Sequence, residues 1–111
     1  MNYDKENIFA KILRKEIPCE AVFENDFILA FKDINPQAKT HILIIPKDEH
    51  VDISDFTQNA SLDVISSFWK SVDELLIKLN LKDKGFQIKT HKGKDGGQEV
   101  FHFHLHLLSN S

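Results

Sequence analysis

The sequence predicts an α+β domain in which about five mostly antiparallel strands form one sheet, with one long helix on a face and one short helix at the side. Three patterns indicate this class. Apolar residues recur at intervals of three and four over residues 59–80, which is typical of an amphipathic helix. Residues 41–45 are rich in β-branched side chains, as in a buried central strand. Residues 100–108 alternate between two faces, as a strand does.

The amino-terminal part of the chain predicts the short helix. It opens at Glu6 or Asn7 and ends before Pro18, because proline lacks the N–H that a continuing helix needs. The apolar residues of this helix fall on one face and are Ile8, Phe9, Ile12 and Leu13. With 111 residues, the chain has room for one domain, residues 1–111, and one core.

Turn-forming residues separate the predicted strands. The pair Asn25-Asp26 joins residues 19–24 and 27–33 into a hairpin. Residues 85–91 alternate as a half-exposed strand and lead into a glycine-rich turn at residues 93–97. This half-exposed strand leaves a sheet edge without proline or an obvious bulge, so we expect the edge to pair with a second copy in a twofold homodimer. That pairing would bring an apolar stripe of the long helix near its mate, formed by Phe68, Trp69, Val72 and Leu76.

Composition excludes several classes of function. The chain is 41% hydrophobic and 28% charged, with a formal net charge of -3 and no basic cluster, so nucleic acid is not expected as a ligand. No apolar run approaches the ~18 residues of a membrane span, so no membrane partner is expected. The single cysteine, Cys19, cannot form an internal disulfide, which indicates a reducing compartment and hence the cytoplasm.

The most informative feature is a run of alternating histidines near the carboxyl end. His102, His104 and His106 share one face of the predicted strand, about 6.6 Å apart from one to the next. Two such rings can tilt toward one zinc ion, but a tetrahedral site would need a further ligand from elsewhere. A row of imidazoles suits an extended anion such as a phosphate chain better, because one ring can attack phosphorus while its neighbours donate hydrogen bonds. A third interpretation is that the histidines only support the structure or face the solvent.

The residues His102-Phe103-His104-Leu105-His106-Leu107-Leu108 follow the pattern His, apolar, His, apolar, His, apolar, apolar. Here the chain resembles the histidine triad (HIT) family of nucleotide hydrolases and transferases. Other blocks resemble its purine nucleoside phosphoramidase (Hint) branch, and the resemblance extends over about residues 7–108. These blocks are residues 8–18, 31–38, 40–47 and 95–98.

The resemblance implies an activity. A HIT enzyme of this branch would cleave purine nucleoside phosphoramidates, which are AMP-amine conjugates, through a nucleotidyl-histidine intermediate and without a cofactor or metal. His104 would be the nucleophile, His102 and His106 would orient it or contact phosphoryl oxygens, and His41 would be a fourth catalytic histidine. The resemblance also implies a homodimer with two separate active sites.

The same resemblance assigns the substrate contacts. Asp33 would bind the ribose hydroxyls, and the turn containing Gly97 and Gln98 would wrap the α-phosphate. His91 and Glu99 depart from the residues usual in the branch, at positions near the phosphate or leaving group. By strand alternation we expect the Glu99 side chain on the face opposite His102. The apolar slot for the purine would be formed by Ile8, Phe9, Ile12 and Ile34.

Other functions remain open at this point. Dinucleoside polyphosphate hydrolysis by the same family is the alternative enzyme activity. A nucleotide-binding module without turnover and a zinc protein are the alternatives outside catalysis. His50 has no assigned role and is expected at the surface.

Overall fold

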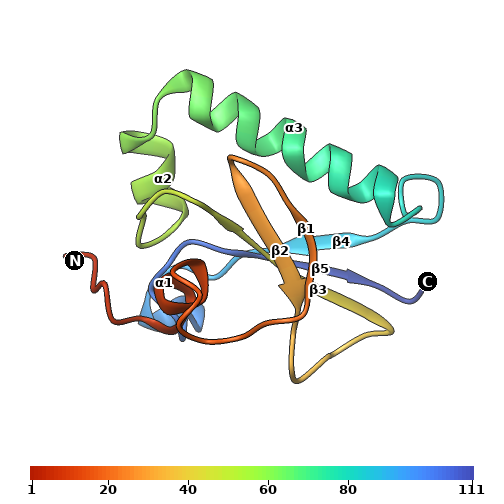
Figure 1. Ribbon diagram of the computed structural model, residues 1–111, viewed down its shortest axis with the longest axis horizontal. Helices are drawn as coiled ribbons and strands as arrows, with labels where there is room; N and C mark the ends of the chain where they lie inside the picture. The colour runs from red at the N-terminus through yellow and green to blue at the C-terminus, as the bar shows by residue number, and fades with distance from the viewer.

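The computed structural model describes residues 1–111 and contains one five-stranded antiparallel sheet with the strand order β1-β2-β3-β5-β4. Figure 1 shows α3 across one face of this sheet and α1 on the opposite side. The predicted α+β class is therefore confirmed. The strands are β1 (Ala21–Glu24), β2 (Ile28–Lys32), β3 (Thr40–Pro46), β4 (Gln87–Lys89) and β5 (Leu105–Ser109). The helices are α1 (Ile8–Leu13), α2 (Ile53–Asn59), α3 (Leu62–Lys78) and a 3-10 turn, η1 (Lys94–Gly96).

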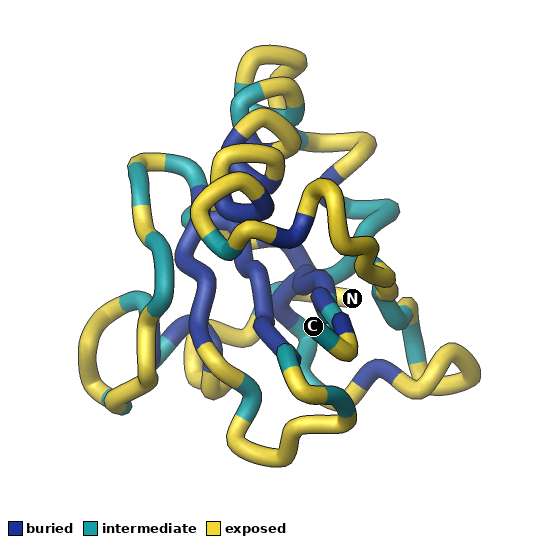
Figure 2. Tube along the Cα trace, turned by 90° about the vertical axis from the view of Figure 1, so that its right-hand side faces the viewer, coloured by how far each residue is buried: buried dark blue, intermediate teal, exposed yellow.

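Strand β3 lies at the centre of the sheet and is buried on both faces, as its β-branched composition predicts. Its alternate residues enter two different cores. Ile42 and Ile44 belong to the larger core, which α3 covers. Leu43 and Ile45 belong to a smaller core on the opposite face, which α1 covers. Figure 2 shows these central strands as the buried interior of the molecule.

The predicted hairpin between β1 and β2 is confirmed, and its turn has a clear chemical cause. The Asn25 side-chain oxygen accepts hydrogen bonds from the N–H groups of Phe27 and Ile28, at 2.8 and 2.9 Å. Asparagine favours such turns because its short side chain can replace a backbone acceptor.

The long helix predicted at residues 59–80 is α3 in the structure, and a shorter helix, α2, precedes it. The sequence did not predict α2, which the Asp52 side chain caps, and the Ser61 side chain caps α3. These caps set the two helix starts, so the helix predicted at residues 59–80 begins instead at Leu62. None of the helices combines the length and the apolar character that a membrane crossing requires.

The apolar stripe of α3 packs against its own chain, contrary to the expectation that it contacts a mate. Phe68, Val72 and Leu76 are buried in the larger core against the sheet of the same chain. Only Trp69 of the predicted stripe remains substantially exposed, at 43%. A long amphipathic helix covers the nearest apolar surface first, and here that surface is the sheet of its own chain.

The histidine run is less regular than predicted, because β5 begins only at Leu105. Residues 100–104 are irregular, and the Phe103 N–H donates to the main-chain carbonyl of His50 at 2.7 Å instead of to a neighbouring strand. His50 is buried rather than at the surface, so its expected placement was wrong. Strand β4 is also shorter than the predicted residues 85–91.

Candidate active site

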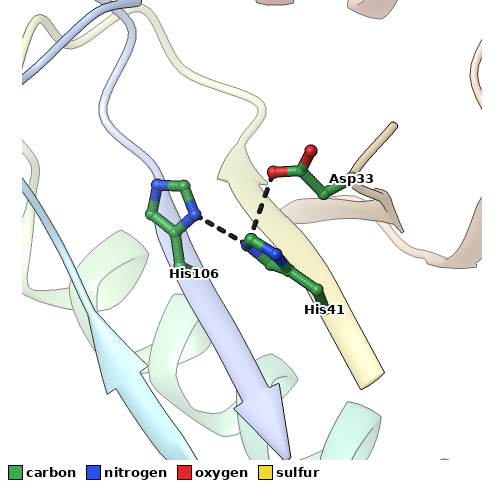
Figure 3. Close-up of side chains that lie close together, drawn as sticks. All are labelled: Asp33, His41 and His106. Carbon is green, nitrogen blue, oxygen red and sulfur yellow. Dashed lines mark hydrogen bonds and ion pairs between the residues drawn. The ribbon is translucent and has the colours of Figure 1, made fainter. Parts of the chain in front are cut away.

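Three side chains from neighbouring strands meet at one end of the sheet (Figure 3). His41 lies in β3 and His106 in the adjacent β5, while Asp33 follows β2 directly. The His41 Nε2 atom is 3.0 Å from His106 Nδ1 and 3.4 Å from an Asp33 carboxylate oxygen. The structure thus brings together two of the four predicted catalytic histidines with the predicted ribose-binding carboxylate.

The backbone of Gln37 fixes the protonation of this group. Its N–H, which can only donate, points at His41 Nδ1 across 3.0 Å. Neutral His41 therefore carries its proton on Nε2, from which it donates to His106 Nδ1. His106 in turn carries its proton on Nε2, which is left free for a ligand. The sequence does not predict this role of Gln37, because a backbone N–H contributes no side-chain signal to a sequence motif.

The same cluster contains the residue types of a metal site, since one ligand atom from each of Asp33, His41 and His106 lies within 4.8 Å of the others. Metal binding requires an unprotonated nitrogen on each histidine. His41 would have to bind through Nε2, but the Gln37 N–H already faces Nδ1, so the ring would have no nitrogen left for its own proton. The donor set therefore fits a hydrogen-bonded chain and does not fit a metal.

His104 and His102 are held by main-chain carbonyls. His104 donates from Nδ1 to the carbonyl of His102 at 2.7 Å, which leaves its Nε2 lone pair unprotonated. His102 donates from Nε2 to the carbonyl of Pro46 at 3.0 Å. The His104 and His106 ring centroids are 5.2 Å apart, so the two rings are direct neighbours. The three histidines of the run thus have three different hydrogen-bonding roles.

Burial keeps these rings neutral. It lowers the pKa of His102 and of His106 to about 4, and it also lowers the pKa of His104. In each case the main cause is the loss of hydration of the charged ring. At pH 7 the rings are therefore neutral, which is the state in which a ring nitrogen can act as a nucleophile.

The predicted apolar slot is only partly assembled. The Phe9 ring meets the His104 ring edge to face, with centroids 4.9 Å apart. Phe9 and Ile12 are buried in the smaller core, where Ile12 serves packing. Ile8 and Ile34 are exposed, and Ile34 retains 90% of its accessible surface.

The glycine-rich turn differs from the expectation that its N–H groups are free to hold phosphate. The N–H groups of Gly96, Gly97 and Gln98 all donate to carbonyls within the turn itself. Gly97 has φ +82°, which explains why glycine occupies the end of η1. The unpaired backbone N–H groups begin one residue later, at residues 99–102, because none of them donates to an acceptor in the chain.

The Gln98 side chain is buried and structural. Its amide nitrogen donates to the carbonyls of Val51 and Val100 at 2.7 and 3.0 Å, and its oxygen accepts from the Gly93 N–H at 2.9 Å. These bonds tie the turn to the start of α2. Gln98 therefore shapes the segment that precedes the histidines and does not present its amide to a ligand.

A cleft of about 370 Å³ opens beside His106. His91 and Glu99 both line it, and the His91 ring centroid is 5.2 Å from that of His106. Strand alternation does not apply at Glu99, because β5 has not yet begun at this residue. The other lining residues are Asp33, Asn35, Gln37, His41, Lys89 and Leu108. A larger hollow of about 640 Å³ lies beside β4, and no histidine lines it.

Comparisons with known proteins agree with this arrangement. The HIT domain matches residues 14–111. An uncharacterized HIT-like protein of Rickettsia prowazekii is 44% identical over 106 residues, which span 96% of this chain and 88% of the relative.

Two solved structures extend the comparison. A HIT family hydrolase from Legionella pneumophila has a TM-score of 0.86 and 39% identity, over 96% of this chain and 94% of the other. A histidine triad nucleotide-binding protein from Candida albicans has a TM-score of 0.80 and 30% identity, over 92% of this chain and 73% of the other. The alternating histidines, the fold and these likenesses agree, and the chain belongs to the HIT family.

Proposed function

We propose that the protein hydrolyses purine nucleoside phosphoramidates, in which AMP is joined to an amine through a phosphorus–nitrogen bond. The observation that carries this proposal is the hydrogen bond from His104 Nδ1 to the carbonyl of His102, which leaves the His104 Nε2 lone pair available to attack phosphorus. Membership of a family that includes a HIT family hydrolase and a histidine triad nucleotide-binding protein supports the proposal.

In the first step, His104 Nε2 forms a bond to the α-phosphorus while the phosphorus–nitrogen bond breaks. The amine nitrogen keeps the electron pair of the broken bond and takes a proton from solvent in the cleft. His104 retains its Nδ1 proton, so the nucleotidyl-imidazole carries a positive charge, which the His102 carbonyl stabilises as hydrogen-bond acceptor. His106 donates from Nε2 to a phosphoryl oxygen or to the leaving group.

In the second step, a water molecule attacks the same phosphorus. Its oxygen forms the new bond, one proton returns to solvent, and the electrons of the phosphorus–nitrogen bond return to His104. The products are AMP and the free amine. Burial lowers the pKa of His104, so the released ring is neutral at pH 7 and ready for another turnover.

The unpaired N–H groups of residues 99–102 are the proposed donors to the α-phosphate. They lie at the start of the histidine run, up to and including His102, and no acceptor in the chain engages them. Consecutive free N–H groups favour an anion because their dipoles add at one place. In this proposal Gly97 and Gln98 act indirectly, by ending the turn and fixing where the free segment starts.

Asp33 and the apolar residues are proposed to bind the nucleoside. One Asp33 oxygen accepts from the Asn35 N–H at 2.8 Å, and the carboxylate keeps further lone pairs for the ribose hydroxyls. The exposed side chains of Ile8 and Ile34 provide apolar surface for the purine, and the Phe9 ring of α1 packs against His104.

We also propose a homodimer in the cytoplasm. Strand β4 ends the sheet and pairs only with β5, so its outer edge has unpaired backbone groups. Phe86, just before this strand, is exposed at 39% and offers apolar area to a mate. The exposed Cys19 has no disulfide partner, which supports a reducing compartment.

A direct assay tests the function. Purified protein is incubated with a fluorogenic adenosine phosphoramidate and, separately, with a diadenosine polyphosphate. We expect release of the amine and AMP from the first substrate, with much slower turnover of the second. Faster turnover of the diadenosine compound would assign the protein to dinucleoside polyphosphate hydrolysis. If the protein binds nucleotide but turns over neither substrate, it would be a nucleotide-binding module instead of an enzyme.

A further inference from the structure

Tyr3 contacts the histidine run from the amino-terminal segment. Its hydroxyl oxygen is 2.6 Å from Nδ1 of His102, and the two rings meet edge to face with centroids 5.6 Å apart. His102 is completely buried. Tyr3 and His102 are 99 residues apart in the sequence, so no local motif predicts their contact.

The direction of this hydrogen bond is determined. The carbonyl of Pro46 accepts from His102 Nε2, so the proton of the neutral ring lies on Nε2. His102 Nδ1 is then an acceptor, and the Tyr3 hydroxyl is its donor. Without that hydroxyl, a buried nitrogen would lack a partner, which proteins rarely tolerate.

Tyr3 is held in place by the turn that starts α1. Asp4 accepts hydrogen bonds from the backbone N–H groups of Glu6 and Asn7, at 2.8 and 3.1 Å. Arg14 donates to the carbonyl of Lys5 at 2.8 Å and thereby ties this turn to the end of α1. The hydroxyl therefore approaches His102 from a fixed support.

We propose that Tyr3 is a positioning residue for His104, acting through His102. Its hydroxyl fixes the ring of His102, and the main-chain carbonyl of that same residue fixes the proton of His104 on Nδ1. A rotated or differently protonated His102 ring breaks its bond to Pro46 and shifts the backbone on which the carbonyl depends. This inference deepens the proposed function, because His104 needs its Nε2 lone pair free only if it is the nucleophile.

The first test measures protonation without substrate. Tyr3→Phe removes the hydroxyl and keeps the ring. Nitrogen NMR of the histidine side chains reports which ring nitrogen carries the proton. We expect the wild type to show His102 protonated on Nε2 and His104 on Nδ1. In Tyr3→Phe, the proton of each ring should be distributed between Nδ1 and Nε2. An unchanged His104 would overturn the proposal, even if His102 changes.

The second test separates positioning from substrate binding. In Tyr3→Phe we expect kcat to fall roughly tenfold with KM nearly unchanged, which corresponds to the loss of about one hydrogen bond in the transition state. Lys5→Ala is the matched control, because Lys5 lies in the same turn and its exposed side chain forms an ion pair with Glu49, at 3.9 Å. A change confined to KM, or an equal loss in Lys5→Ala, would contradict a positioning role.

A double-mutant cycle tests whether Tyr3 acts through the His102 ring. In a His102→Leu background, Tyr3→Phe should lower kcat by less than twofold, because the acceptor of the hydroxyl is gone. A full tenfold cost in that background would overturn the proposal. If the wild type has no phosphoramidase activity, the proposed function fails, and the NMR comparison still decides whether Tyr3 controls His104.

Discussion

The His104 ring donates its Nδ1 proton to the main-chain carbonyl of His102 across 2.7 Å, two residues back along the chain. In a regular strand that carbonyl would point toward a neighbouring strand and accept a ladder hydrogen bond. Here β5 begins only at Leu105, and no backbone N–H donates to the His102 carbonyl. The irregular segment before the strand is therefore what makes the carbonyl available to a side chain.

Replacing His104 with alanine should abolish phosphoramidate turnover, by a factor on the order of 10³ or more, because the nitrogen that forms the covalent bond is lost. Nucleotide binding and melting temperature should remain close to those of the wild type. Rapidly quenched wild-type protein should carry an added nucleotidyl mass on His104. Cys19→Ser is a suitable control, because Cys19 is exposed and does not line the cleft beside His106. Near-normal activity of His104→Ala would rule out the nucleophile assignment.

The protein should lose stability as the pH falls from about 6.5 to 4. Burial lowers the pKa of His102 to about 4 in the folded state, whereas the ordinary value is 6.5. In this range the unfolded chain binds more protons than the folded chain does. The free energy of unfolding therefore decreases as the pH falls, and the contribution of His102 to it is fully present above pH 6.5. For His102 alone we expect about 2 kcal/mol between pH 7 and pH 5. Urea unfolding at the two pH values measures it, and an equal loss in His102→Leu would refute this origin.

The sequence predicts the elements whose burial is regular along the chain. The β-branched run of β3 and the apolar spacing of α3 identify both correctly, because a single packed face imposes its period on the sequence. The short helix α2 was missed, although Asp52 before it is a good helix cap. With seven residues and only Phe56 buried, α2 is too short to show a clear apolar period.

The candidate site is predicted less completely, because much of it is built from backbone groups. The alternation of the histidines identifies the right residues. It does not show that the Gln37 N–H determines which nitrogen of His41 carries the proton. It also does not show that the Gln98 side chain forms hydrogen bonds within the protein. The partner of His102, Tyr3, lies at the other end of the chain and belongs to no periodic pattern. Contacts of this kind depend on the final packing.

Exhaustive chelation should change neither the activity nor the melting temperature. The Gln37 N–H occupies Nδ1 of His41, so this ring has its proton on the nitrogen that a metal would need. Metal analysis and thermal melting of the same chelated sample provide the test. A structural zinc ion contributes strongly to folding, so a large fall in melting temperature that zinc reverses would show that the cluster binds metal.

Glu99 should favour leaving groups that carry a positive charge. It lines the cleft beside His106, together with Lys89, which has the opposite charge. In Glu99→Gln we expect kcat/KM for an amine with a distal ammonium group to fall roughly threefold relative to a neutral amine, as for an exposed ion pair. Lys89→Gln should shift the ratio in the opposite direction. Glu74→Gln, on the exposed face of α3, should leave the ratio unchanged. An unchanged ratio in Glu99→Gln would remove Glu99 from the leaving-group side of the site.

The last prediction is the twofold dimer. Light scattering at micromolar concentration should give close to twice the chain mass of 12.8 kDa, since β4 leaves an unpaired sheet edge. Val72 is unsuitable for testing the interface, because it is buried in the core of its own subunit and a charge there would unfold the protein. Phe86→Glu places a charge on an exposed side chain beside the β4 edge and should weaken the dimer without lowering the helix content. Glu20→Gln, next to the opposite edge strand β1, should not alter the mass. A wild-type mass equal to one chain would show that the β4 edge stays unpaired.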